Sequence, residues 1–223
     1  SDHLAAGLGI DDLAPLELAP VEPDPAKADH VEPTPMDMRS HLQPAGTWLF
    51  ETFVEKPPIW GRDDEILWPD DESLLIAAPT GIGKTTLANL LVQASVGLGS
   101  GMVLGYPVTE CDRVLYLAMD RPAQIRRAMR RVFTEDDSAH LSDRLTVYPA
   151  PLPEALDENP WILAELAEIA QADRVIIDSV KDAMLEPSAD KSGSAFNRAV
   201  QMCNAEGVPS CGLHHQCKSQ NGV

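Results

Sequence analysis

The sequence predicts an α/β fold with a mainly parallel sheet flanked by helices. From residue 73 onward, short apolar runs with the length of buried strands alternate with segments whose apolar residues recur at helical spacing. The strands are expected at residues 73–78, 113–118, 144–148, 174–180 and 208–216. Because ligands of such sheets bind at the carboxyl ends of the strands, the residues after each strand are the first candidates for a functional site.

The first strand leads into the motif A-P-T-G-I-G-K-T-T at residues 78–86, and helical periodicity follows it. Strand, glycine-containing turn and helix are the context that distinguishes a phosphate-binding loop from a chance match. Gly81 and Gly83 allow backbone N–H groups to converge on phosphate oxygens. The helix that opens at Lys84 directs its positive dipole end at the same anion. We therefore predict that this chain binds a nucleoside triphosphate.

Each polar residue of this loop has an expected task. Lys84 is predicted to bridge the β- and γ-phosphates, and the Thr85 hydroxyl is predicted to ligate Mg²⁺. The motif departs from the usual pattern at Ala78, which replaces the first glycine and is the smallest alternative at the strand exit. The residues predicted to bind ATP are Pro79, Thr80, Gly81, Ile82, Gly83, Lys84, Thr85 and Thr86.

Two aspartates at the ends of other predicted strands are expected at the same edge as Lys84. Asp178 fits the carboxylate that holds Mg²⁺ together with Thr85. Asp120 is the acid available to orient and polarise the attacking water. An aspartate just before Pro122 is equally well explained as the N-cap of the next helix, so both interpretations of Asp120 stay open.

The last predicted strand ends in His214, His215 and Gln216, and one of these three is expected to sense the γ-phosphate. The predicted catalytic residues are thus Lys84, Asp120, Asp178 and His215. Zinc is a weaker alternative, because the ligand types lack C-x2-C pairs and strand alternation separates His214 from its neighbours. The residues of this alternative are Cys203, Cys211, His214, His215 and Cys217.

The formal net charge of −18 argues against attraction of the whole surface to nucleic acid. One predicted helix, which follows Pro122, departs from this acidic composition. Its polar face is either solvated, or contacts DNA phosphate or an acidic neighbouring subunit. The arginines that share this face are Arg126, Arg127, Arg130 and Arg131.

Composition divides the chain near residue 46. Residues 1–46 are rich in Asp, Glu, Pro and Ala, and such a segment buries too little apolar area to offset its ordering entropy. We expect an acidic linker there and a globular domain at 47–223. The aromatic residues between Trp48 and Trp60 are predicted to pack on the sheet edge, with docking on a neighbouring subunit or near the nucleotide base as the alternative.

Cysteine usage and hydropathy favour a cytoplasmic protein. Four cysteines without framework spacing suggest reduced thiols. The sequence has no run of about 18 apolar residues and no secretory signal, so no membrane partner is expected. It begins with Ser1 rather than Met, and we expect it to be a piece of a longer chain.

Four spaced motifs resemble those of RecA-like ATPases of the hexameric RepA-type replicative helicase group, which has relatives in phage and bacterial primase–helicases. These motifs are A-P-T-G-I-G-K-T-T, L-Y-L-A-M-D-R-P, V-I-I-D-S-V-K-D and L-H-H-Q, and the likeness covers about residues 46–223. The resemblance implies a homo-hexamer with ATP between subunits and single-stranded DNA in the central channel. Lys84 and Thr85 match the Walker A pair, Asp178 the Walker B acid and His215 the histidine motif.

Parts of the pattern leave the function open. Relatives tend to have Glu-Asp where this chain has Met119-Asp120, so the usual catalytic glutamate is absent or replaced by Asp120. The DNA-binding loop, the strands that complete the sheet and the trans-acting arginine are expected largely beyond Val223. Residues 1–10 resemble the tail of a primase-type TOPRIM domain, although a plain helix end is equally consistent.

Two other classes of function therefore remain. One is a RecA-like recombination, repair or clock-type ATPase, and the other is a nucleotide-binding assembly module with little hydrolysis. A small-molecule kinase is less consistent with the sequence, because no arginine-rich lid insert precedes the last strand.

Overall fold

Five parallel strands form the central sheet, in the order β3–β9–β8–β6–β7. Their bounds are β3 Leu74–Ala78, β6 Val114–Ala118, β7 Leu145–Tyr148, β8 Arg174–Asp178 and β9 Ser210–His215. The computed structural model describes residues 42–50, 56–185 and 190–215. The predicted α/β fold with a mainly parallel sheet is confirmed, and each predicted strand is present with its end shifted by at most two residues.

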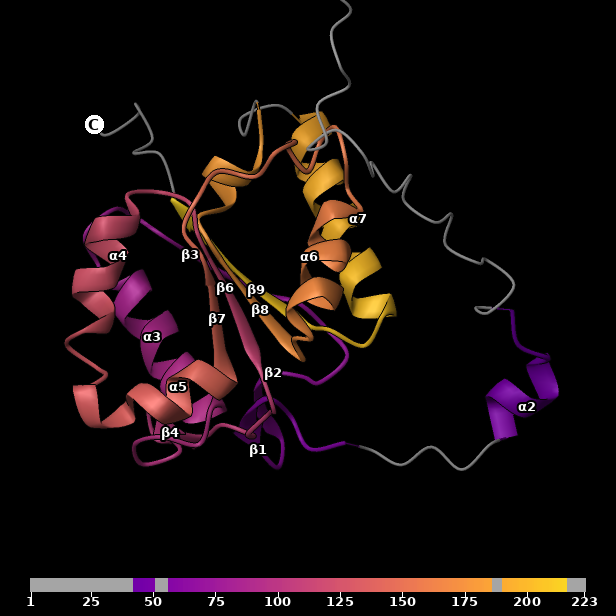
Figure 1. Cartoon of the computed structure of the whole chain (residues 1–223). Helices are drawn as coiled ribbons and strands as arrows, with labels where there is room; N and C mark the ends of the chain where they lie inside the picture. The colour runs from indigo at the N-terminus through magenta and orange to yellow at the C-terminus, as the bar shows by residue number, and fades with distance from the viewer. Residues whose placement is uncertain (1–41, 51–55, 186–189, 216–223) are drawn as a thin grey trace, which may run out of the picture. The chain divides into compact units, whose positions relative to one another are not determined.

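Helices cover both faces of this sheet (Figure 1). On one face lie α3 (Lys84–Ser95), α4 (Pro122–Met129) and α5 (Ser138–Arg144), and on the other lie α6 (Ile162–Ala170) and α7 (Asp190–Ala205). Two 3-10 helices, η3 (Glu135–Asp137) and η4 (Val180–Ala183), lie in the connections. None of the helices in the described ranges is long and apolar enough to cross a bilayer.

Strand alternation divides the buried side chains into two clusters, one on each face of the sheet. Tyr116 of β6 packs in the cluster that contains Leu91 of α3. Its neighbour Leu117 packs in the cluster that contains Leu163 of α6 and Ala199 of α7. The strands β6 and β8 are buried along their whole length, because both faces of the sheet are covered there.

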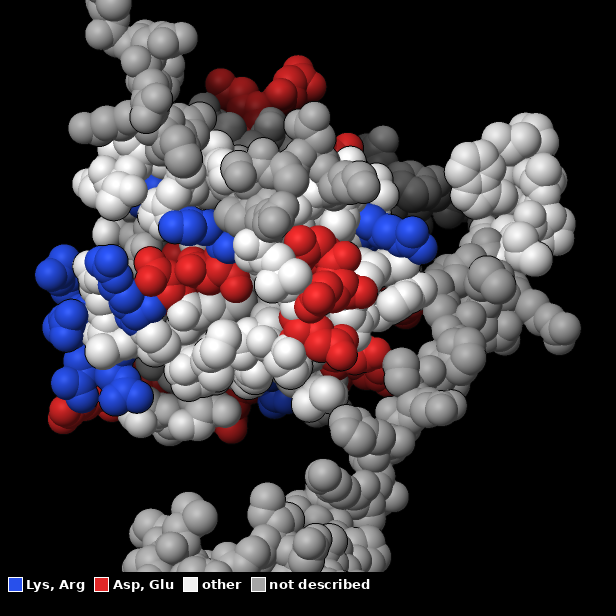
Figure 2. Space-filling view, turned by 90° about the horizontal axis from the view of Figure 1, so that it is seen from above, with Lys and Arg blue, Asp and Glu red and all other residues white. Residues whose placement is uncertain are grey.

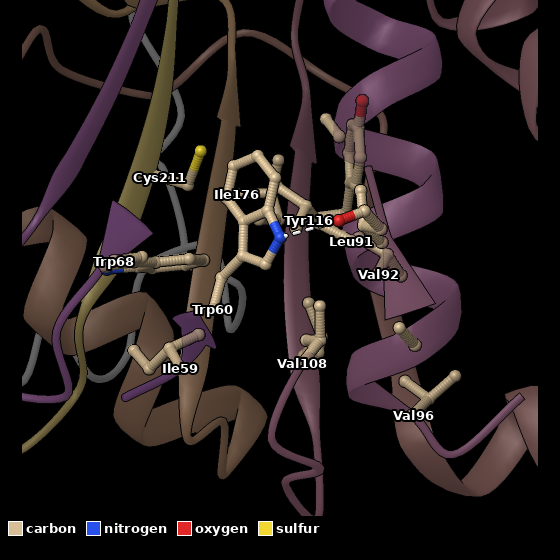
Figure 3. Packing of buried hydrophobic residues seen from close by; sticks show 14 of the residues in the cluster. Ile59, Trp60, Trp68, Leu91, Val92, Val96, Val108, Tyr116, Ile176 and Cys211 are labelled. Carbon is tan, nitrogen blue, oxygen red and sulfur yellow. Dashed lines mark hydrogen bonds between the residues drawn. The ribbon is translucent and has the colours of Figure 1, made fainter. Parts of the chain in front are cut away.

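Two short antiparallel hairpins add to the first cluster and were not predicted. One pairs β1 (Trp60–Arg62) with β2 (Glu65–Trp68), and the other pairs β4 (Met102–Val103) with β5 (Tyr106–Pro107). The indole N–H of Trp60 donates a hydrogen bond of 3.0 Å to the Val103 carbonyl, which ties the hairpins together. Figure 3 shows the Trp60 and Trp68 rings packed beside Ile176 and Cys211 of the sheet.

The aromatic segment before the first sheet strand is divided in the structure. The chain divides into two compact units, Ser1–Phe53 and Val54–Val223. In the second unit Ile59 and Trp60 are buried, so core packing is confirmed for them. In the first unit Trp48, Leu49 and Phe50 of α2 (Ala45–Phe50) are exposed within that unit, and their packing on the sheet edge stays a prediction. Most of the predicted linker 1–46 lies outside the described residues.

Candidate nucleotide-binding site

The loop between β3 and α3 has the backbone that its glycines predict. Gly81 and Gly83 have φ values of 87° and 102°, in the left-handed region that favours glycine. Gly83 is the N-cap of α3 and no side chain caps this helix. The first N–H groups of α3 therefore have no side-chain acceptor and are available to an anion, as a phosphate-binding loop requires.

Lys84 folds back over this loop. Its ammonium donates hydrogen bonds of 2.7 Å to the Ala78 carbonyl and 2.9 Å to the Pro79 carbonyl, and the side chain is buried. Burial lowers the pKa of Lys84, and the nearby Asp178 carboxylate opposes that shift. The ammonium is thus held at the loop by two neutral acceptors, which a triphosphate can replace with charged oxygens.

Asp178 lies at the end of β8 and is 4% exposed. Its Oδ2 accepts a hydrogen bond of 3.1 Å from the Thr85 hydroxyl, so the structure brings together two residues that are 93 positions apart. Burial raises the pKa of the Asp178 carboxyl, while hydrogen bonds and the His215 charge lower it and the Asp120 charge raises it. A hydroxyl and a carboxylate side by side are oxygen ligands of the kind that Mg²⁺ takes, so this pair fits the predicted metal ligands.

Tyr116 is a residue of this site that the sequence analysis missed. It is fully buried in β6, and its hydroxyl donates a hydrogen bond of 2.8 Å to Asp178 Oδ2. Burial, and then the Asp178 charge, raise the pKa of Tyr116 well above its usual value, so the hydroxyl stays protonated and remains a donor. The signal in the sequence was a tyrosine inside an otherwise aliphatic strand, since a buried phenol needs a hydrogen-bond partner.

Asp120 lies at the border of the site, directly after β6. Its backbone N–H points at the Asp178 carbonyl, at 3.4 Å, and its carboxylate is 3.6 Å from the Arg121 guanidinium. The N-cap position of α4 falls on Arg121, whose φ is 51°, and no side chain caps this helix. The Asp120 side chain, 43% exposed, is therefore accessible to solvent beside the buried Asp178.

The two histidines of β9 face opposite sides of the sheet, as strand alternation predicts. His215 pairs in register with Ala78, and its charge acts on Asp178. Its Nδ1 is buried and has no hydrogen-bond partner in the described part of the chain. His214 instead lines a hollow of about 410 Å³ on the α7 side, together with Phe196. Gln216 lies outside the described residues.

The structure describes two of the three cysteines in the zinc alternative, Cys203 and Cys211. Burial raises the pKa of both Cys203 and Cys211 to about 12, so both thiols are protonated at neutral pH. Within the described ranges, no group of three or more His, Cys, Asp or Glu side chains is arranged to hold a metal ion. Cys217 lies outside those ranges.

Comparison with protein families adds a match over most of the chain. Residues 39–221 match the family model described as an AAA domain, and this range contains every site residue discussed above. The chain belongs to this AAA domain family. No curated protein matches the sequence. The family match, the parallel sheet and the loop geometry together establish this AAA domain as a P-loop ATPase fold.

Proposed function

We propose that this AAA domain is the ATP-hydrolysing motor of a DNA replication helicase or primase–helicase that moves along single-stranded DNA. The observation that carries the nucleotide part of the proposal is the convergence of Lys84, Thr85 and Asp178 at one edge of the sheet. The order of the four sequence motifs supports the RepA-type group, and with it a homo-hexamer that binds ATP between subunits.

The chain's own residues divide the work of hydrolysis in this proposal. Backbone N–H groups of residues 81–85 and the Lys84 ammonium bind and orient the phosphates. Thr85 and Asp178 hold Mg²⁺, which when bound neutralises charge that develops on the phosphoryl oxygens. Tyr116, fully buried in β6, keeps the Asp178 carboxylate in place through its hydrogen bond.

Two residues at the border of the site are assigned to the reacting end of the triphosphate. Asp120 is the partly exposed acid beside Asp178, and we assign it the orientation of the attacking water. His215 presents a buried ring nitrogen without a partner in the described residues, and a γ-phosphate oxygen is the acceptor that would satisfy it. Asp120 would thereby take the place of the glutamate that the resembled helicase group tends to have at the position of Met119.

The first test is equilibrium titration of the full chain with a fluorescent ATP analogue. Lys84→Ala removes a charge-assisted contact worth about 1.5–3 kcal/mol, so nucleotide affinity should fall about 10- to 150-fold. The matched control is Lys56→Ala, which removes an exposed lysine paired with Asp70 and should leave the affinity unchanged. Equal affinity of the wild type and Lys84→Ala would contradict the nucleotide-binding proposal.

Phosphate release and strand displacement separate the competing functions. A helicase motor should hydrolyse ATP faster when single-stranded DNA is added and should displace a strand from a forked duplex. A recombination or repair ATPase should show DNA-stimulated hydrolysis without displacement. An assembly module should bind the nucleotide and release phosphate at the background rate in both conditions.

A further inference from the structure

Four arginines form an exposed basic surface in a chain whose net charge is −18. Arg126 and Arg127 belong to α4, and Arg130 and Arg131 directly follow it. We call these four residues the α4 arginine surface. None of them forms an ion pair or a side-chain hydrogen bond with another residue that the structure describes. Figure 2 shows basic side chains gathered at the left of the view, where α4 lies in Figure 1.

The arrangement of these arginines is unfavourable for the isolated helix. The Arg130 N–H donates to the Arg126 carbonyl at 3.1 Å, so these two side chains stand one helical turn apart on the same side. Like charges at this spacing repel each other, and the negative end of the helix dipole compensates the repulsion only in part. An external polyanion is the partner that would remove the repulsion at all four positions at once.

The shape beside the arginines favours a nucleic acid as that polyanion. Arg126 and Arg130 border a hollow of about 950 Å³ between α4, α5 and β7. Apolar side chains, among them Met129, Leu145 and Val147, line it together with polar ones that include Glu135. A single strand offers both chemistries, because its phosphates pair with guanidinium groups while its unpaired bases can lie against an apolar surface.

The position of the surface also connects it to the nucleotide. The helix α4 begins at Pro122, two residues after Asp120, and the intervening Arg121 is ion-paired with Asp120. The helix α4 is thus joined through Arg121 to the acid that we assign to the attacking water. We propose that the α4 arginine surface binds the phosphate backbone of single-stranded DNA. This inference rests on the proposed function and assigns its DNA contact.

The test measures the affinity of the full chain for a fluorescent oligothymidylate by anisotropy, over a range of salt concentrations. Each phosphate contact contributes about −0.7 to the slope of log affinity against log salt for a single strand. Arg126→Gln/Arg130→Gln and Arg127→Gln/Arg131→Gln should each flatten the slope by about 1.4, and the quadruple variant by about 2.8. The matched control is Arg62→Gln/Arg198→Gln, which removes two exposed positive charges elsewhere and should keep the wild-type slope.

The outcomes distinguish failure of this inference from failure of the proposed function. All variants should bind the fluorescent ATP analogue with wild-type affinity, which verifies their fold. If the wild type binds the oligonucleotide and the arginine variants keep its slope, the assignment to α4 is overturned while the proposed function stands. If the wild type binds ATP but no oligonucleotide at low salt, the proposed DNA motor is overturned as well. Displacement of the oligonucleotide by polyglutamate of equal charge at equal concentration would overturn the inference in favour of an acidic protein partner.

Discussion

Replacing Tyr116 by phenylalanine should destabilise the fold in a pH-dependent way. The substitution keeps the ring in the core but removes one of the two side-chain hydrogen bonds that Asp178 Oδ2 accepts. Tyr116 is fully buried and Asp178 is 4% exposed, so water does not replace the lost donor. A hydrogen bond to a charged group contributes about 1.5–3 kcal/mol, which corresponds to about 10- to 150-fold in the folding equilibrium.

The sign of the pH dependence follows from the pKa of Asp178. Burial raises the pKa of Asp178 in the folded protein above its ordinary value of 3.8. The free energy of unfolding therefore falls as the pH rises from 3.8 through the folded-state pKa, because the buried carboxyl must then ionise. The hydrogen bond from Tyr116 lowers the pKa and limits this loss. Without it the pKa rises further, and the loss continues to a higher pH. The free energy of unfolding should therefore fall more at neutral pH than in acid.

Urea unfolding at about pH 5 and about pH 8 measures the loss in the free energy of unfolding of Tyr116→Phe relative to the wild type. Tyr148→Phe is the matched control. The Tyr148 hydroxyl donates to the Pro151 carbonyl at 3.2 Å in an exposed position, so its removal should cost less than about 1 kcal/mol at both pH values. A loss for Tyr116→Phe that is the same at both pH values, or no larger than that of Tyr148→Phe, would refute the reasoning.

Two further predictions concern the loop and the metal ligands. Asp178→Asn should retain part of the nucleotide affinity, because Lys84 still binds the phosphates, but should abolish Mg²⁺-dependent phosphate release; retained release would move the metal site elsewhere. Gly83→Ala should lower the free energy of unfolding by about 1 kcal/mol, because an alanine is strained in the left-handed backbone conformation of this position. No steric cost is added, because a Cβ there meets no atom within 4 Å. Thermal or urea unfolding checks that cost, and a loss of several kcal/mol would show that a steric contact is also involved.

Features that depend on local spacing could be predicted from the amino-acid sequence alone. Alternating strands and helices predicted the parallel sheet, because hydrophobic periodicity records which faces are buried. The positive φ values of Gly81 and Gly83 follow from a loop that only glycine enters without strain. The opposite directions of His214 and His215 follow from the two-residue period of a strand.

Which of these local features contact one another depends on tertiary packing. In the sequence, Tyr116 is one of several residues of a strand that is predicted to be buried. Its hydrogen bond with Asp178 forms because β6 and β8 are neighbours in the sheet. The hairpins of β1–β2 and β4–β5 were missed, because strands of two to four residues are too short to show a period. Trp48 of α2 is exposed and Trp60 is buried, although both are tryptophans of the same aromatic segment. Strand order and burial arise from contacts between segments far apart in the chain, and no local pattern of residues records those contacts.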